Sequence, residues 1–235
     1  MMLERIDYDD RGTALTGWLA RPSGAARGAV VIYPTIANVT PAIERRAEML
    51  ADAGFVAMIA DFYGEPVVSF EASRPLADKL RADVDHYRTR ASAAILALSE
   101  HPAAQRLRLA AIGYCMGGQA ALEMARFGQP LELAASFHGI LSTNRPATAE
   151  TPIKPRLLIC HGDADPMVPR EQIMAFWAEM DDARANWHFH SYAGVKHGFT
   201  DPGSADRGMA ALGYDASADR QSWAALRSLL DEVFA

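Results

Sequence analysis

Short apolar runs alternate with stretches of helical periodicity along most of this chain, and that alternation limits the possible folds more than any other feature of the sequence. Each run is apolar throughout rather than at every second position, which is typical of strands buried on both faces of a parallel sheet. Strands and helices in alternation predict an α/β fold with a mostly parallel central sheet flanked by helices. The runs span residues 29–33, 55–60, 107–113, 133–138 and 156–161.

Further elements are expected around these runs. Residues 6–8 and 15–19 alternate on either side of the turn-rich segment 9–12, which predicts an N-terminal β-hairpin. Helical spacing of apolar residues predicts helices between the strands, and the last helix is expected to pack Trp223, Leu226, Leu229 and Leu230 against the sheet. The predicted helices span residues 43–53, 76–98, 116–127, 170–180 and 218–234.

Three long segments rich in Gly, Pro and Asp stand out between the predicted elements, at residues 61–73, 139–155 and 200–217. Ligands of open parallel sheets bind where loops leave the carboxyl ends of the strands. We therefore expect these loops to be walls of a binding site, with plain surface connection as the alternative role.

Composition and charge narrow the class of protein. The 235 residues are 50% apolar and 22% charged, as in folded soluble domains, and no repeat or linker divides them, so one domain is expected over residues 1–235. A net charge of −6 without a Lys/Arg cluster argues against a nucleic-acid partner and against anionic membranes. Charged residues near the start and the lack of an apolar run of about 18 residues favour a cytoplasmic protein.

The motif at residues 113–118 points to chemistry. It reads Gly-Tyr-Cys-Met-Gly-Gly between a predicted buried strand and a predicted helix, which is the pattern of a nucleophile elbow with Cys115 in place of serine. Gly113 and Gly117 are the small flanking residues that such a turn needs. A helix N-terminus lowers the pKa of a thiol and favours the reactive thiolate. The alternative is that Cys115 is a small buried hydrophobic residue, as we expect for Cys160.

An acid and a base follow in the order that a catalytic triad needs. Asp163 and Asp165 lie in the turn after a predicted strand, and the sharp turn at the following proline favours Asp165 as the residue that orients a histidine. His197, in a loop of small residues after a strand, is the expected base. Cys115, Asp165 and His197 reproduce the nucleophile, acid, histidine order of the α/β-hydrolase fold. We expect solvated positions for His86 and His101, a half-exposed strand for His188 and His190, and supporting structural roles at strand ends for His138 and His161.

These motifs resemble the dienelactone hydrolases, or carboxymethylenebutenolidases, of the α/β-hydrolase superfamily. The resemblance covers most of the chain and rests on the elbow motif, the Gly-x-x-Asp-Pro-x-Val-Pro turn with Asp165, and the Lys-His-Gly-Phe loop with His197. It implies an α/β-hydrolase fold without a large cap domain, and a Cys-His-Asp triad that opens lactones or esters through a thioester. It also implies an oxyanion hole formed by the backbone N–H groups of Ile36 and Met116. We expect a small-molecule substrate, no cofactor and no metal, and a monomer or homodimer.

The chain departs from the family pattern at two positions. In the best-known members a glutamate in the loop after the first parallel strand helps to hold and activate the thiol, and Thr35 stands in its place here. An arginine shortly after the histidine binds the substrate carboxylate in those members, and Asp201 replaces it. Arg74 or Arg81 is the candidate cation for an anionic substrate. Thr35, Arg74, Arg81 and Asp201 are therefore the expected substrate-binding residues.

Two other functions use the same residues. A non-catalytic protein of the same fold would use Cys115 as a redox-sensing thiol, because an accessible thiolate is open to oxidation to sulfenic acid. A metal hydrolase would use His138, His161, Asp163 and Asp165, although the sequence lacks the short-range histidine pair on one helix that is typical of such sites. Turnover distinguishes the first alternative from a hydrolase, and metal content tests the second.

Overall fold

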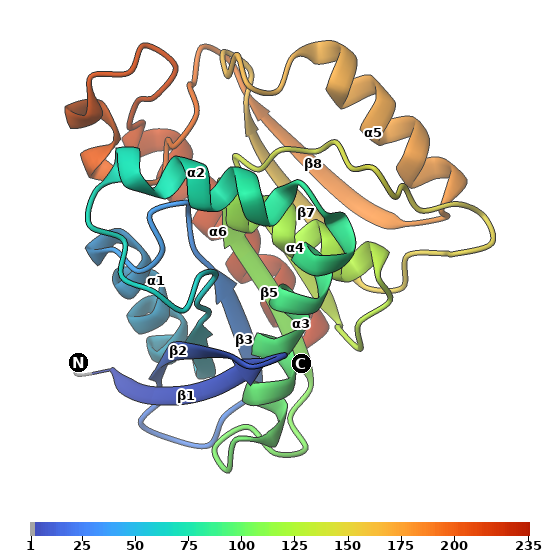
Figure 1. Cartoon of the computed structure of the whole chain (residues 1–235). Coiled ribbons are helices and arrows are strands. Elements are labelled where there is room, and N and C mark those ends of the chain that lie inside the picture. The colour runs from blue at the N-terminus through green and yellow to red at the C-terminus, as the bar shows by residue number, and fades with distance from the viewer. Residues whose placement is uncertain (1–2) are drawn as a thin grey trace.

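An eight-stranded sheet forms the centre of the molecule in the structure, a computed structural model that describes residues 3–235 (Figure 1). The strand order is β1-β2-β4-β3-β5-β6-β7-β8; β1 and β2 are antiparallel to their neighbours, and the strands from β4 to β8 are parallel. The strands are β1 Glu4–Asp10, β2 Thr13–Ala20, β3 Gly28–Tyr33, β4 Phe55–Ile59, β5 Leu109–Tyr114, β6 Leu133–Phe137, β7 Arg156–Gly162 and β8 Asn186–Tyr192.

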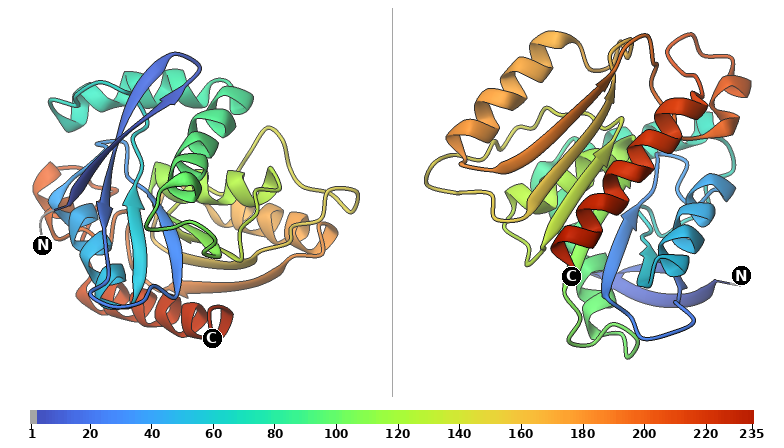
Figure 2. Two further views of the ribbon diagram at one scale, coloured as in Figure 1. Left: turned by 90° about the horizontal axis from the view of Figure 1, so that it is seen from below. Right: turned by 180° about the vertical axis from the view of Figure 1, so that it is seen from behind.

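Helices cover both faces of the sheet, which explains why the central strands are apolar throughout. Every residue of β3, β4, β5 and β6 is buried. One face packs against α1 and α6, and the opposite face packs against α2, α3, α4 and α5. Figure 2 shows the sheet between these layers. The helices are α1 Pro41–Asp52, α2 Phe70–Arg81, α3 Val84–Glu100, α4 Met116–Arg126, α5 Arg170–Asp182 and α6 Ala216–Val233, with a short 3₁₀ helix, η1, at Pro202–Arg207.

The predicted hairpin, the buried strands and the packing of α6 are confirmed. The backbone of Arg11 and Gly12 adopts positive φ at the hairpin turn, and the Gly12 N–H donates to the Asp9 carboxylate at 2.8 Å. Leu226, Leu229 and Leu230 are buried in the core beneath α6, and Trp223 packs against that core from a half-buried position.

One predicted helix is wrong. Residues 76–98 form the parts of two helices, α2 and α3, rather than a single one. Asp83 ends the continuity, because its extended backbone leaves the helical region and its carboxylate accepts hydrogen bonds from the N–H groups of Asp85 and His86, which caps α3. The loop expected over residues 61–73 is correspondingly shorter, since α2 begins at Phe70 with Ser69 as its cap.

The parallel strands bring their carboxyl ends to one edge of the sheet. The segments that follow β3, β4, β5, β7 and β8 all leave from this edge. The long segment between β6 and β7 contains no helix or strand among the described residues, and so it forms no cap domain. No helix within residues 3–235 is long and apolar enough to cross a membrane.

Candidate active site

The backbone at Cys115 makes a turn that only small neighbours permit. Cys115 lies between β5 and α4 with φ 56° and ψ −119°, a conformation that L-residues rarely adopt. A Cβ atom on Gly113 would lie 1.8 Å from the Gly117 carbonyl oxygen, and one on Gly117 would lie 2.0 Å from the Tyr33 carbonyl oxygen. Neither position therefore has room for a side chain. The two glycines allow the turn that presents the thiol at the carboxyl edge of the sheet.

Asp165, and not Asp163, contacts the expected base. The distance from Asp165 Oδ2 to His197 Nδ1 is 2.7 Å, and both side chains are buried. The turn holds Asp165 in place, because its second oxygen accepts from the Met167 N–H at 2.9 Å. Asp163 instead pairs with Arg170 at the surface, at 2.7 Å. The sequence favoured Asp165 with Asp163 as the alternative, and the turn directs Asp165 toward the histidine.

His197 and Cys115 form an electrostatically coupled pair. Burial by itself lowers the pKa of His197, but the negative charge of a Cys115 thiolate and the hydrogen bond and charge of Asp165 outweigh it and raise that pKa to about 10. Burial raises the pKa of the Cys115 thiol, and the charge of His197 contributes most to turning the net shift downward. Because both shifts favour the charged forms, the geometry supports a thiolate beside an imidazolium.

Two backbone N–H groups converge on the same sulfur. The N–H groups of Met116, at the start of α4, and of Ile36, in the loop after β3, each lower the pKa of the Cys115 thiol. The loop of Ile36 is a tight turn, in which the Asn38 N–H donates to the Thr35 carbonyl at 3.0 Å and Asn38 adopts positive φ. These are the two donors that the family resemblance implies for an oxyanion hole.

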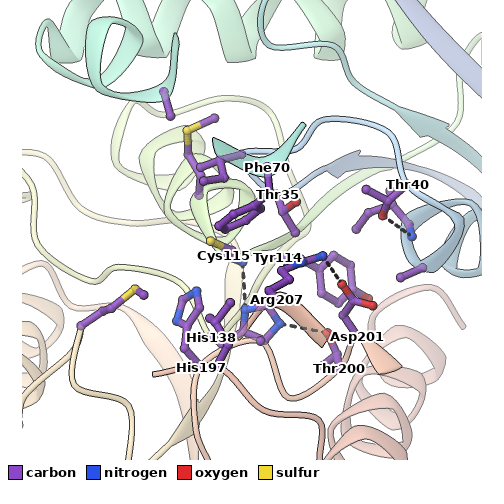
Figure 3. A pocket seen from close by; sticks show the side chains of 18 of the residues that line it. Thr35, Thr40, Phe70, Tyr114, Cys115, His138, His197, Thr200, Asp201 and Arg207 are labelled. Atoms are coloured by element: carbon purple, nitrogen blue, oxygen red, sulfur yellow. Dashed lines mark hydrogen bonds and ion pairs between the residues drawn. The ribbon is translucent and has the colours of Figure 1, made fainter. Parts of the chain in front are cut away.

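A cavity of about 330 Å³ opens beside Cys115 and is lined mainly by apolar side chains (Figure 3). It contains each of the residues expected to bind substrate: Thr35, Arg74, Arg81 and Asp201. Thr35 is buried and its hydroxyl accepts from the Ala37 N–H, so it stabilises the turn and carries no charge toward the thiol. The cavity is also lined by Ile36, Thr40, Ile43, Arg46, Phe70, Tyr114, Met116, His138, Ile140, Met167, Thr200, Arg207, Met209 and Leu212.

Asp201 does not stand alone in the cavity wall. Its carboxylate pairs with Arg207 at 2.5 Å and also caps η1 by accepting from the Gly203 N–H. The Arg207 guanidinium lies 4.8 Å from the centre of the Phe70 ring, on which Arg74 also lies at 5.8 Å. Sequence reasoning missed Arg207, although the loop at 200–217 had been singled out as a wall. Asp201 and Arg207 are six residues apart in the sequence, at the two ends of a short helix. They form an ion pair only when this loop is folded.

His138, for which a supporting role at a strand end was expected, contacts the backbone of Cys115. Its Nδ1 accepts a hydrogen bond from the Cys115 N–H at 3.1 Å, which places the proton of the neutral ring on Nε2, 2.9 Å from the Thr200 hydroxyl. Its ring lies edge-on to that of His197 with centroids 5.1 Å apart (Figure 3). Burial and the charge of His197 hold the pKa of His138 well below its usual value. The neutral ring therefore stabilises the backbone of the elbow and does not compete with His197 for a proton.

The other histidine at a strand end makes no comparable contact. Both ring nitrogens of His161 are buried without a hydrogen-bond partner among residues 3–235, and burial lowers its pKa. No group of three or more His, Cys, Asp or Glu side chains in that same part of the chain is arranged to hold a metal ion. Cys160 is fully buried in the core, and burial raises its pKa to about 12, so it behaves as the hydrophobic residue that was expected.

Comparison with known proteins gives a family match over almost the whole chain. The model of the dienelactone hydrolase family matches residues 15–234. A solved dienelactone hydrolase-like promiscuous phosphotriesterase from metagenomic libraries superposes with a TM-score of 0.93 at 33% identity, covering 100% of this chain and 99% of the other. A Pyrococcus horikoshii acylaminoacyl peptidase, at 14% identity and a TM-score of 0.73, shares the fold over 98% of this chain and 41% of its own.

Two curated relatives are also similar. A probable 2-oxo-3-(5-oxofuran-2-ylidene)propanoate lactonase of Bradyrhizobium sp is 28% identical over 216 residues, covering 84% of each chain. An uncharacterised protein of Caenorhabditis elegans is 35% identical over 147 residues, which are 62% of this chain and 93% of the relative. The fold expected from the motifs, an α/β-hydrolase fold with a mostly parallel sheet and no cap, is confirmed by the solved neighbours.

Proposed function

The chain belongs to the dienelactone hydrolase family, and from that premise we propose that it hydrolyses small-molecule esters or lactones with Cys115 as nucleophile, His197 as base and Asp165 as the residue that orients the base. One observation carries the proposal. Cys115, with a lowered pKa, lies in the wall of an apolar cavity, and His197 beside it is hydrogen-bonded to a buried carboxylate at 2.7 Å.

The proposed reaction has two steps. The Cys115 thiolate attacks the carbonyl carbon, a C–S bond forms, and the carbonyl oxygen becomes an oxyanion held by the N–H groups of Ile36 and Met116. The C–O bond then breaks, and the leaving oxygen takes the proton of the His197 imidazolium. A thioester remains. His197 next removes a proton from water, the hydroxide attacks the thioester, and the acid leaves as the thiolate returns.

The residues around the thiol support an acyl substrate with a good leaving group. A stabilised thiolate is itself a good leaving group, so the first tetrahedral intermediate collapses forward only when the substrate oxygen leaves more easily than sulfur. Enol lactones and activated esters meet this condition, and amides do not. Binding in the cavity involves Thr35, Arg74, Arg81 and the Asp201–Arg207 pair, and Arg74 and Arg81 are the cations for a negatively charged substrate.

The test is turnover by the purified protein and two variants. We expect wild type to hydrolyse an activated ester such as p-nitrophenyl acetate or an enol lactone, and Cys115→Ala and His197→Ala to lose about 10³-fold or more in kcat. A phosphotriester belongs in the same panel, because the similar metagenomic protein is a promiscuous phosphotriesterase. Equal turnover by the three proteins would rule out this mechanism.

The redox-sensing alternative is tested by the same material. A protein that uses Cys115 only as a redox thiol reacts with iodoacetamide and peroxide but turns over no ester, lactone or phosphotriester. The apolar cavity beside the thiol favours the hydrolase, because a sensor thiol needs access to a small oxidant and no room for an organic substrate.

A further inference from the structure

Two buried tyrosines contact the two residues whose N–H groups form the proposed oxyanion hole. The Tyr63 hydroxyl donates to the carbonyl of Ile36 at 3.0 Å, and the Tyr87 hydroxyl donates to the carbonyl of Met116 at 2.7 Å. The tyrosines come from different elements, the loop after β4 and helix α3. The same kind of contact is thus made twice, once to each donor residue.

Neither tyrosine lines the cavity beside Cys115, so neither is placed to touch a substrate there. Tyr87 is almost completely buried and Tyr63 is 9% exposed. Burial raises the pKa of both phenols above the ordinary value, so both keep the proton that they donate. Their hydrogen bonds to the site are made to backbone carbonyls.

The loop that carries Ile36 depends on such contacts for its shape. It belongs to no helix or regular strand, and it is tied to the segment after β4 by side chains. The Asn38 side chain donates to the Asp61 carboxylate at 2.7 Å, and the same carboxylate oxygen accepts from the Tyr63 N–H at 2.9 Å. Asp61 therefore places the backbone of Tyr63, and the Tyr63 hydroxyl places the Ile36 carbonyl.

Direction matters for an oxyanion donor more than for an ordinary hydrogen bond. The N–H must point at an oxygen that exists only during the reaction, and it gains nothing from reorganising at that moment. A displacement of about 1 Å can reduce a rate by about 10²-fold. A hydroxyl that holds the residue of each donor therefore acts on the rate through the oxyanion.

We infer that Tyr63 and Tyr87 are positioning residues that aim the N–H groups of Ile36 and Met116 at the reacting carbonyl oxygen. The inference rests on the proposed function, since it needs a reaction that passes through an oxyanion. It assigns a role to a pair of side chains that the triad does not include.

The chain offers a matched control in Tyr33. Its hydroxyl donates to the Ala91 carbonyl at 2.7 Å, it is fully buried, and the acceptor lies in helix α3, away from both donors. Tyr33→Phe removes the same kind of bond as Tyr63→Phe and Tyr87→Phe. A loss of thermal stability that all three variants share can therefore be distinguished from an effect on the oxyanion hole.

The experiment measures ester turnover and thiol alkylation on the same four proteins. Iodoacetamide reacts with the Cys115 thiolate by displacement at carbon and forms no oxyanion. At a pH where the thiol is fully ionised, the alkylation rate is therefore independent of the oxyanion donors' effect on the thiol pKa. We expect Tyr63→Phe and Tyr87→Phe each to lower kcat for p-nitrophenyl acetate by about tenfold with KM nearly unchanged, below the 10²–10³-fold that loss of a whole donor costs. At a pH where the thiol is fully ionised, their alkylation rates should stay within about twofold of wild type, as should turnover by Tyr33→Phe.

Three results would overturn the inference, and they can be told apart. If kcat of both variants falls no more than that of Tyr33→Phe, the hydroxyls do not aim the donors. If alkylation falls in parallel with turnover, the tyrosines act on the thiol rather than on the oxyanion. If wild type is alkylated at Cys115 but turns over no ester, lactone or phosphotriester, the proposed function fails and the inference fails with it. Should one variant not fold, the other decides, because the two tyrosines lie on separate elements.

Discussion

At the scale of single residues, the site depends on which of two neighbouring carboxylates reaches the histidine. Asp163 and Asp165 are two positions apart in one turn, yet one pairs with Arg170 at the surface and the other is buried against His197. The sequence placed both carboxylates near the expected base, and the proline that follows Asp165 favoured this residue over Asp163. The choice is made by the backbone of the turn, in which the Met167 N–H holds the Asp165 carboxylate.

This contrast predicts unequal effects of two matched substitutions. Asp165→Asn removes the charge that raises the pKa of His197, so the imidazolium is less stable and the pKa of the Cys115 thiol rises. We expect kcat for an activated ester to fall by about 10³ to 10⁴-fold and the alkylation curve to move to higher pH. Asp163→Asn is the control, and its kcat should stay within about twofold because the Asp163 carboxylate pairs with Arg170 at the surface. Equal loss in both variants would contradict the assignment.

The two cysteines are predicted to differ in reactivity. The pKa of Cys115 is lowered by His197 and two N–H groups against the effect of burial, whereas burial raises that of Cys160 to about 12. With iodoacetamide near pH 7, below the usual thiol pKa of about 8.5, the native protein should take up one label and the denatured protein at higher pH two. Peptide mapping identifies the site. Reaction falls as the pH falls through the lowered pKa of Cys115, because the thiolate is then protonated.

At the scale of elements, the elbow illustrates what the sequence predicted well. A buried strand, a Gly-x-Cys-x-Gly motif and a helix were all recognisable in order, and the contacts at Gly113 and Gly117 explain the pattern physically. The broken helix was not recognised, because the apolar spacing continues through Asp83 and a single capping side chain ends it. The Tyr63 and Tyr87 contacts left no signal either, since a buried tyrosine looks like any core residue until its hydroxyl partner is known.

The elbow predicts a strong effect of a single methyl group. In Gly117→Ala the new Cβ would meet the backbone of Tyr33 and Pro34, at 2.0 Å from one carbonyl oxygen and 2.4 Å from the other, and backbone cannot move aside as a side chain can. We expect the free energy of unfolding to fall by about 3 kcal/mol, at the upper end for overpacking, and activity to fall with it. Gly24→Ala, where nothing lies within 4 Å, is the control and should unfold like wild type in urea. An unchanged midpoint for Gly117→Ala would show that the elbow relaxes.

At the scale of the whole molecule, a buried ion pair links the two helices on one face of the sheet to the loop that carries His197. Arg46 of α1 and Asp219 of α6 are both buried and in direct contact, and Arg46 also donates to the Thr200 carbonyl at 3.2 Å. Thr200 follows His197 by three residues and its hydroxyl contacts His138. The Arg46–Asp219 pair therefore connects α1 and α6 to the loop that carries His197.

Removing one partner of this pair should destabilise the fold. Asp219→Ala leaves the Arg46 charge buried without its carboxylate, and we expect the free energy of unfolding to fall by about 3–5 kcal/mol. Asp7→Ala removes one partner of the ion pair between Arg5 and Asp7, whose side chains are 61% and 70% exposed. It should change the free energy of unfolding by about 1 kcal/mol or less. Urea denaturation of both variants checks the difference. Similar midpoints for the two would mean that the Arg46 charge finds solvent.

The site is divided unevenly along the chain. The elbow and the loop of Ile36 lie in the first half, whereas Asp165 and His197 come from the segments that follow β7 and β8. The largest of the effects that lower the pKa of Cys115 comes from His197, so the thiol lacks its main activating partner until residue 197 is in place. During synthesis on the ribosome, the nascent chain therefore carries a less acidic thiol than the finished protein. The thiol reaches its full reactivity only when the last part of the sheet has folded, so a truncated product should react more slowly.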